Sequence, residues 1–480
     1  MSMKTLFPIA LAAALAAGYA GAESPAPATP TATTPVQAPV PPELPAPAAA
    51  PAAPAKPGPV ISINGGASMS LGYIEATHGP ETFHYHHNRM QSVGGQLLLK
   101  ARMDEHFLVE TGLGILERHY LAGRISDNSG RTPFLWSPYV VNADFNYAWS
   151  FTETIKLGIT GGYFPYSYNP DVKNLGLYLI RGPVYPGILI SGFENKYARP
   201  VANTLGLRIQ NVFGNFEENL ILNSETETYP LFDGSLAYIA GYKFGQALRI
   251  GGGVNFTHLI PVEGKLTHPD TLAYDNSDAP SSFNGDPNTR TWTYVDTVAH
   301  DTTFLSFAGT KVMANACFDP KAFFDSDIMG AEDLRLYGEV AVIGLDMSAA
   351  YKAVYGGYKR RMPVMVGFNL PVFKFLDHLS MEVEWYGARF KDDLARYQST
   401  TANYMSPLPV VNANGENLGR DDWKWSLHAQ KTWNQFRFSG QVANDHSRPG
   451  GTITAPGSEW RAYSSRPTDF YWVLKTGFFF

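Results

Sequence analysis

The sequence predicts an all-β protein, a transmembrane antiparallel β-barrel of about sixteen strands, within a range of about fourteen to eighteen. Three observations carry this prediction. Apolar and small polar residues alternate with a period of two in one segment after another, short and long connections alternate between these segments, and the last segment is an aromatic strand ending in Phe480. Short turns at one rim, long loops at the other and an even strand number are typical of barrels that cross membranes.

The composition of the 480 residues is compatible with such a barrel and excludes several other classes. Aromatic residues at 13% supply enough apolar surface to argue against general disorder. The net charge of −6 gives no basic footprint for nucleic acid. The mean hydropathy of −0.16 does not fit a protein of many membrane helices. The hydrophobic content of 44% suits strands that expose half of their side chains to water.

Residues 1–22 predict a cleaved secretory signal peptide. Lys4 precedes an apolar stretch from Leu6 to Ala17, and the small residues Ala20 to Ala22 provide a cleavage site after Ala22. The alternative, a membrane anchor helix, should be longer and should lack this exit sequence. Export is compatible with the single cysteine, Cys317, because a barrel closed by backbone hydrogen bonds needs no disulfide.

Residues 23–59 predict a Pro/Ala-rich periplasmic linker. From Ser24 to Pro59 the chain holds thirteen prolines and eleven alanines, and its only charged residues are Glu43 and Lys56. Proline favours extended geometry, so this stretch should act as a semi-rigid spacer without a core of its own. Contact with the cell wall is the alternative role for the linker.

Residues 60–480 predict the barrel. From Val60 to Tyr73 the apolar residues fall at odd positions and the small polar residues at even positions, and the same alternation returns from Leu379 to Arg389 and from Asp422 to Trp433. Strands are expected at 60–74, 92–104, 106–119, 137–149, 154–164, 203–211, 215–223, 232–244, 246–259, 302–318, 333–347, 363–370, 378–390, 422–433, 435–445 and 468–480. The segment from Ile188 to Phe193 is an alternative strand.

The last predicted strand carries the most specific signal. From Asp469 the sequence reads DFYWVLKTGFFF, and its large apolar residues share one face: Phe470, Trp472, Leu474, Phe478 and Phe480. A terminal strand ending in Phe resembles the signal by which the bacterial assembly machinery recognises outer-membrane barrels. The aromatic residues at the predicted strand ends suit the water interface of a membrane: Trp136, Trp149, Tyr163, Trp385, Trp423, Trp433 and Trp472.

The strand count and the stretch FPYSYNPDVKNLGLYLIRGPVYPG, from Phe164 to Gly187, resemble porin-like outer-membrane β-barrel proteins that are uncharacterised. This resemblance covers the chain from about Val60 onward and is architectural. It implies that the third long loop, Pro165 to Ala202, folds inward and narrows a pore, that the protein lies in the outer membrane of a Gram-negative-type bacterium, and that it forms a homotrimer. The chain lacks the acidic P-E-F-G-G-D-type segment of typical porin third loops.

The residues of this third loop support inward folding on their own. Leu175, Leu177, Tyr178, Leu179 and Ile180 are too apolar to lie in external water. Folding into the barrel would cover them and would form a constriction with these residues: Asp171, Lys173, Tyr178 and Arg181. Packing of the loop against the outer rim or a neighbouring subunit is the alternative.

A barrel of sixteen to eighteen strands leaves an aqueous channel, so the polar face of each strand should line a pore. The predicted pore-lining residues are Lys100, Arg102, Glu110, Lys156, Arg208, Arg249, Lys311, Arg335, Glu339, Glu382, Glu384 and Arg437. Basic groups outnumber acidic ones on this face, which suggests a weak anion preference near Arg102, Arg208 and Arg249. The same charges could instead form internal ion pairs that brace a plugged barrel.

No cofactor is expected, and the candidate metal sites are weak. His78, His84, His86 and His87 lie in the first long loop and could meet on a divalent metal, although a solvated loop is the simpler interpretation. The aspartates between Pro261 and Asp301 could bind calcium, but their order is not that of an EF-hand: Asp270, Asp275, Asp278, Asp286, Asp296 and Asp301.

The sequence therefore favours a non-enzymatic channel for small hydrophilic solutes or ions. A structural or adhesion barrel with an occluded lumen and surface-binding loops is the first alternative. A hydrolase is the second alternative, because Asp421-Asp422 and Asp445-His446 resemble the Asp-Asp and Asp-His pairs of outer-membrane proteases. In those proteases the two pairs face each other across a groove, whereas in this chain they lie at the ends of adjacent predicted strands. The expected partners are outer-membrane lipid, lipopolysaccharide and the barrel-assembly machinery, without nucleic acid.

Overall fold

The computed structural model describes residues 59–75, 88–121, 135–180, 202–224, 232–262, 293–296, 301–304, 309–324, 327–345, 362–385, 423–444 and 470–480. Contacts divide the chain into units of residues 1–56 and 57–480, and every described residue belongs to the second unit. The predicted signal peptide and linker lie outside the described residues, except for Pro59. Within the described ranges, no helix has the length and apolar character needed to cross a membrane.

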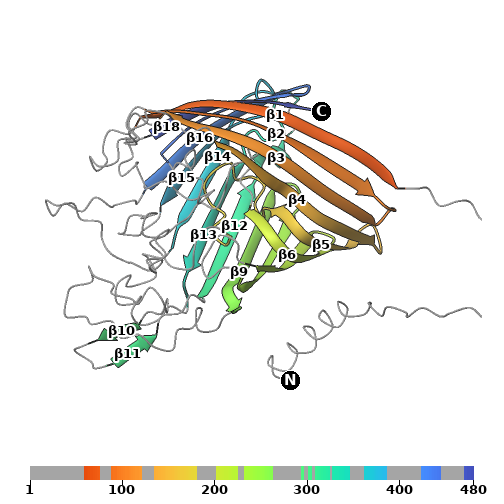
Figure 1. The fold of residues 1–480 in the computed structure, drawn as a ribbon, viewed down its shortest axis with the longest axis vertical. Coiled ribbons are helices and arrows are strands. Elements are labelled where there is room, and N and C mark those ends of the chain that lie inside the picture. The colour runs from red at the N-terminus through yellow and green to blue at the C-terminus, as the bar shows by residue number, and fades with distance from the viewer. Residues whose placement is uncertain are drawn as a thin grey trace, which may run out of the picture. The chain divides into compact units, whose positions relative to one another are not determined.

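Sixteen antiparallel strands close into one barrel (Figure 1), as the sequence predicts. Every barrel strand pairs with its neighbours in chain order, and the last pairs with the first. The strands are β1 Val60–Glu75, β2 Asn88–Arg102, β3 Phe107–Leu121, β4 Leu135–Ser150, β5 Ile155–Tyr166, β6 Ala202–Phe213, β7 Phe216–Ser224, β8 Gly234–Phe244, β9 Leu248–Ile260, β12 Gly309–Phe318, β13 Leu336–Ile343, β14 Val364–Leu370, β15 His378–Trp385, β16 Trp423–Trp433, β17 Phe436–Ala443 and β18 Phe470–Phe479. A closed barrel of this strand number is porin-like in its architecture.

Alternation of side chains separates an inner face from an outer face. On β15, Ser380, Glu382 and Glu384 are buried on the inside, whereas Met381 between them is exposed on the outside. Large apolar side chains are exposed on the outer faces of the other strands as well, and the outward aromatic residues Trp149, Trp423 and Trp433 are exposed. An apolar outer face and a polar inner face are the reverse of a soluble protein, which buries its apolar side.

The barrel closes through β1 and β18. The register places Tyr73 opposite Trp472 and Ala67 opposite Phe478. At the end of this ladder, Gly65 and Phe480 exchange two backbone hydrogen bonds, each 3.0 Å from nitrogen to oxygen. Closure leaves neither strand with an unpaired edge, which is the condition for a sheet to lie in lipid.

With one exception, the connection 319–335, short connections lie at one rim of the barrel and longer ones at the other. The short-turn rim is defined by the connections 103–106, 151–154, 214–215, 245–247, 319–335, 371–377 and 434–435, and the opposite end is the long-loop rim. The connection 319–335 is longer than the sequence suggests and contains the 3-10 helix η2 Pro320–Phe323.

The strand predicted at 302–318 is wrong in its first part. Barrel pairing begins at Gly309, which lies opposite Thr257 of β9. The segment before it forms β11, Asp301–Phe304, which pairs with β10, Thr293–Asp296, in a separate two-stranded sheet. Period-two alternation does not reveal which partner a strand takes, and here a local hairpin replaces the barrel neighbour.

The strands differ in length around the barrel. Strands β1 to β4 have 16, 15, 15 and 16 residues, and Figure 1 shows them as the long red to orange ribbons. Strands β13, β14 and β15 have 8, 7 and 8 residues. The strands of one wall of the barrel are therefore about twice as long as those of the opposite wall.

Candidate functional site

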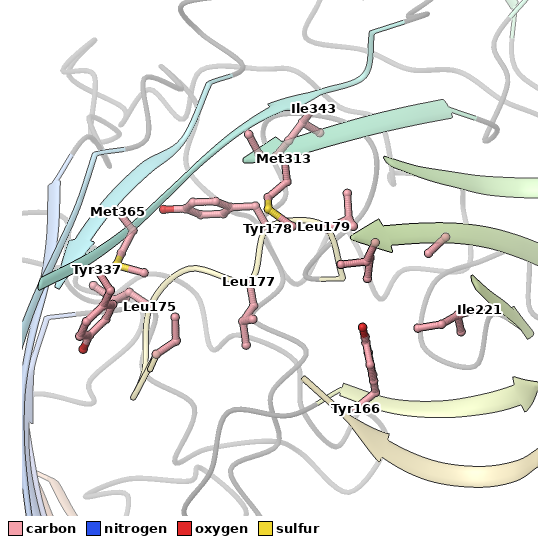
Figure 2. Packing of buried hydrophobic residues seen from close by; sticks show 14 of the residues in the cluster. Tyr166, Leu175, Leu177, Tyr178, Leu179, Ile221, Met313, Tyr337, Ile343 and Met365 are labelled. Carbon is pink, nitrogen blue, oxygen red and sulfur yellow. The ribbon is translucent and has the colours of Figure 1, made fainter. Parts of the chain in front are cut away.

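Residues 167–180 leave β5 at the long-loop rim and turn into the barrel. This stretch is called the inward segment below. It contacts β9, β13 and β15, which are far from it in sequence, and Figure 2 shows Leu175, Leu177 and Leu179 among side chains of the surrounding strands. The described part of the third loop is therefore folded inward, as predicted.

Glu382 of β15 anchors the first part of the inward segment. Its carboxylate accepts hydrogen bonds from the backbone nitrogens of Lys173, Asn174 and Leu175, at 2.6, 2.8 and 2.7 Å. A buried carboxylate is costly unless several donors replace its lost water, and three amides provide that replacement. Glu382 thus holds the segment through its backbone, whatever side chains stand at those three positions.

Two further carboxylates hold the next turn of the inward segment. Glu339 of β13 accepts from the backbone nitrogens of Leu177 at 3.1 Å and Tyr178 at 2.7 Å, and Glu384 of β15 accepts from Gly176 at 3.4 Å. Gly176 and Leu177 have φ values of +84° and +60°. Backbone in this left-handed region turns successive amides to the same side, which creates a concave site for an anion.

Each of the three carboxylates also accepts a hydrogen bond from a tyrosine hydroxyl. Tyr178 donates to Glu384 at 2.8 Å, and the same role is played for Glu339 and Glu382 by Tyr168 and Tyr337. Burial and the neighbouring charge of Glu339 raise the pKa of Tyr168 well above its usual value, so its hydroxyl stays protonated and can donate.

Ion pairs fix the end of the inward segment that lies near the short-turn rim. Asp171 accepts from Arg249 at the start of β9 and from Arg335 just before β13, the latter at 3.0 Å. Arg335 also contacts Asp319 at 3.3 Å. Burial alone would raise the pKa of Asp319, but hydrogen bonds and charge from Lys321, together with Arg335, lower it below its usual value.

One side of the lumen is a packed apolar core. The buried residues of the inward segment contact inward side chains of β7, β8, β12, β13 and β14, as Figure 2 shows for Met313, Ile343 and Met365. The cluster comprises Phe164, Tyr166, Val172, Leu175, Leu177, Tyr178, Leu179, Ile221, Ala237, Ile239, Met313, Cys317, Tyr337, Ala341, Ile343 and Met365. The apolar residues that the sequence placed in the lumen are thus covered.

The inner face of β1 to β4 is polar and more accessible to water. Ser70 and Ser92 form a hydrogen bond of 2.5 Å across β1 and β2, and Lys100 pairs with Glu110 of β3 at 2.6 Å. The Lys100 side chain is 39% exposed, whereas Glu382 on the packed side is 1% exposed. The lumen is therefore divided into a packed half and a polar half.

The structure separates the predicted pore-lining residues into different settings. On inner strand faces lie Lys100, Glu110, Lys156, Arg208, Arg249, Lys311, Glu339, Glu382, Glu384 and Arg437. Arg102 is exposed at the short-turn rim. The inward segment is bound by Glu339, Glu382, Glu384, Arg249 and Arg335, so these five hold protein groups where the sequence predicted contact with solute.

Arg208 keeps a position between the two halves. Its Nε donates to Asn219 at 2.7 Å, and its guanidinium lies 5.1 Å from the ring centroid of Tyr166. Arg437 lies over the ring of Phe479 at 4.9 Å. Both contacts fix the orientation of the charge at the inner wall.

Several other predicted sites lie outside the described residues. They are the constriction residue Arg181, the histidines His78, His84, His86 and His87, the loop aspartates Asp270, Asp275, Asp278 and Asp286, the residues Asp421, Asp422, Asp445 and His446, and the alternative strand from Ile188 to Phe193. Of Asp296 and Asp301 the structure describes only the backbone. In the described part of the chain, no group of three or more His, Cys, Asp or Glu residues could hold a metal ion.

Sequence reasoning missed a buried histidine pair. His378 and His428 stack with ring centroids 5.1 Å apart, and Nε2 of His378 lies 2.8 Å from Nδ1 of His428. Glu332 lies 3.6 Å from Nδ1 of His378 and also pairs with Lys173 of the inward segment at 2.7 Å. Both histidines occupy the polar positions of their strands, so alternation alone would have predicted that they point inward. That they lie next to each other depends on the register between β15 and β16, which alternation does not give.

No family model and no curated protein matches the chain. Among solved structures, the chain is similar to a triple mutant and a double mutant of the porin from Rhodopseudomonas blastica. Both matches have 9% sequence identity and a TM-score of 0.39, and both cover 88% of this chain and 100% of the porin chain.

Proposed function

We propose that this protein is an outer-membrane channel through which small hydrophilic solutes or ions diffuse passively, without catalysis. The observation that carries the proposal is the divided lumen. The inward segment fills one half with an apolar core, while the inner face of β1 to β4 keeps hydroxyl, amide and charged groups that remain partly accessible. A narrowed but polar passage sorts solutes by size and charge.

The chemistry of the polar wall suits uncharged polar solutes as well as ions. Asp144 accepts from Asn142 at 3.0 Å and from Asn146 at 2.7 Å, and Thr160 donates to Asn146 at 2.6 Å. Asn142 and Asp144 are themselves buried, whereas Asn146 and Thr160 are partly exposed and can offer donors and acceptors to a solute that has lost part of its water.

A weak anion preference remains part of the proposal, now centred on Arg208. Arg249 is ion-paired with Asp171, which reduces its field at the passage, whereas Arg208 contacts the neutral amide of Asn219 and the ring of Tyr166. A reversal potential of anion sign in a salt gradient supports this preference, and a zero or cation-directed potential overturns it.

The alternative function is a structural or adhesion barrel whose lumen is occluded. It is favoured by the same inward segment, because three buried carboxylates and two arginines brace it firmly against the wall. An occluded barrel predicts negligible conductance and no swelling of proteoliposomes in solutes of any size.

The test of a diffusion channel is conductance in planar bilayers, with one narrowing variant and one matched control. Ser92 faces the lumen on the polar side and Val93 is exposed on the outside of the same strand. Ser92→Trp should lower single-channel conductance because a large ring enters the passage, whereas Val93→Trp should leave it unchanged. Absence of current in the unaltered protein would favour the occluded barrel, and equal currents in the two variants would place the passage elsewhere.

Placement in the outer membrane, contact with lipid and lipopolysaccharide, and homotrimer formation belong to the same proposal. So does recognition of β18 by the bacterial barrel-assembly machinery. On β18, Leu474, Phe478 and the following Phe480 are exposed on the outside, and they alternate with the inward Gly477 and Phe479. This alternation presents an apolar face that only Thr476 interrupts, which supports the assignment of Phe470, Trp472, Leu474, Phe478 and Phe480 as an assembly signal.

A further inference from the structure

Two connections at the short-turn rim are bonded into one unit. Residues 319–335 link β12 to β13, and residues 371–377 link β14 to β15. Buried Asp333 joins them, because its Oδ2 accepts from the backbone nitrogens of Gly330 at 2.9 Å and Phe373 at 3.0 Å. The described residues of the two connections are called the rim platform below.

The rim platform exposes an unusual number of large apolar side chains. Phe375 is 80% exposed and Phe323 is 71% exposed. Phe324, Ile328 and Phe373 on the same two connections are exposed as well. Apolar residues gathered in this way on a rim are unfavourable in water and indicate a surface that contacts something apolar.

The rim platform is continuous with the outer, apolar face of the barrel on the β12 side. Phe318 is the last residue of β12 and is exposed on its outer face. Its ring lies 6.0 Å from that of Phe323, between centroids. The exposed ring of Phe323 therefore extends the outer face of the barrel.

A second contact joins the rim platform to the outer face on the β16 side. Lys431 has its side chain on the outside of β16, where its Nζ donates to the backbone oxygen of Lys374 at 2.9 Å. Trp433, two residues further along the same outer face, is 65% exposed. The platform thus bridges the outward aromatic residues of β12 and β16.

The barrel needs such a bridge because the strands between these two are short. A transmembrane strand requires about 9 to 11 residues to cross the hydrocarbon layer. Strands β13, β14 and β15 have 8, 7 and 8 residues. Apolar side chains at the short-turn rim next to these strands would add the lipid-facing surface that the short strands lack.

We infer that the rim platform is a lipid-binding foot, which inserts Phe323, Phe373 and Phe375 into the headgroup region of the phospholipid leaflet at the short-turn rim. Aromatic side chains prefer this interface between hydrocarbon and water. The inference rests on the proposed placement in a membrane. The alternative is that a periplasmic protein covers the same rings. Vesicles of purified lipid contain no such protein, so rings that are shielded from water in these vesicles are covered by lipid.

The test uses a single spin label on protein reconstituted into phospholipid vesicles, which is practical because Cys317 is the only cysteine. In a Cys317→Ala background, the label is placed by Phe375→Cys, and by Phe323→Cys in a second protein. The controls are Ile250→Cys on the exposed outer face of β9 and Asn215→Cys in the exposed turn between β6 and β7 at the same rim. Relaxation by oxygen reports lipid, and relaxation by a water-soluble nickel chelate reports water.

The expected result is that labels at 375 and 323 resemble the label at 250, with nickel accessibility several-fold below that at 215. If the label at 250 is in lipid while those at 375 and 323 are as accessible to nickel as the label at 215, the proposal that the rim platform binds lipid is wrong. The proposed placement of the barrel in a membrane would still hold. If the label at 250 is also in water, the proposed membrane placement itself fails.

Discussion

At the level of single residues, Glu339, Glu382 and Glu384 show how a side chain can be placed correctly by sequence and given the wrong partner. Alternation puts all three on the inner face, which the structure bears out. Their partners are backbone amides of the inward segment, and Lys173 lies 209 positions before Glu382. Amide donors leave no mark in a sequence, because every residue except proline carries one.

Replacing Glu382 tests the anchoring of the inward segment. Glu382→Ala removes the acceptor of three amides, and each hydrogen bond to a charged group contributes about 1.5–3 kcal/mol. The segment should loosen, and Cys317, which is 8% exposed beside Asp171, should react faster with a polar thiol reagent. Labelling followed by mass spectrometry measures the rate.

The matched control for this labelling experiment is Glu110→Ala on the polar wall. Glu110 pairs with Lys100 on β2 and is distant in barrel order from β12. Its loss should leave the Cys317 rate near that of the unaltered protein. Equal acceleration in both variants would mean that the barrel as a whole had loosened, and no acceleration in Glu382→Ala would refute the anchor.

At the level of elements, period-two alternation predicted the barrel strands well, because the outer and inner faces of a barrel impose opposite demands on neighbouring residues. It failed where that demand is absent. β11 pairs with β10 in a separate hairpin, and the connection 319–335 contains a 3-10 helix. The inward path of the third loop was predictable from its apolar residues, but the position of its anchors depended on pairing between distant strands.

Closure of the barrel should be sensitive to the size of residue 65. A Cβ at Gly65 would lie 2.6 Å from the ring of Phe480 and 3.1 Å from the carbonyl oxygen of Gln96. Gly65→Val should therefore weaken the pairing of β1 with β18 and reduce the fraction of barrel that resists unfolding in detergent. The shift in gel mobility on heating measures that fraction.

Ala67→Val is the control for closure, since Ala67 already has a Cβ and lies two residues further along the outer face of β1. It adds the same kind of side chain without the clash and should fold like the unaltered protein. Normal folding of Gly65→Val would show that Phe480 can move aside at little cost.

At the level of the whole molecule, the main finding is the division of the lumen. The packed half resembles the core of a soluble protein, with Leu175, Leu177 and Tyr178 fully buried. The polar half lies along the wall formed by the longest strands, where the Lys100 side chain is partly exposed. Period-two alternation does not show this division by itself, because the division depends on which distant strands the inward segment contacts.

Removal of the inward segment should enlarge the passage. Residues 169–179 would be replaced by a short Gly/Ser linker, together with Glu339→Gln, Glu382→Gln and Glu384→Gln so that no buried charge is left without its donors. Single-channel conductance should rise severalfold, and the free energy of unfolding should fall because the apolar core is lost. An unchanged conductance would show that the segment does not limit the passage.

The pairing of β1 with β18 has a consequence for the timing of synthesis. Residues near Val60 are translated first among the barrel strands, yet their partner Phe470–Phe479 follows every other strand. Until β18 is in place, β1 and β17 each lack one pairing partner, and an open strand edge can pair with unrelated chains. The barrel can therefore only be completed after the whole domain has been translated, and it depends on protection during that interval.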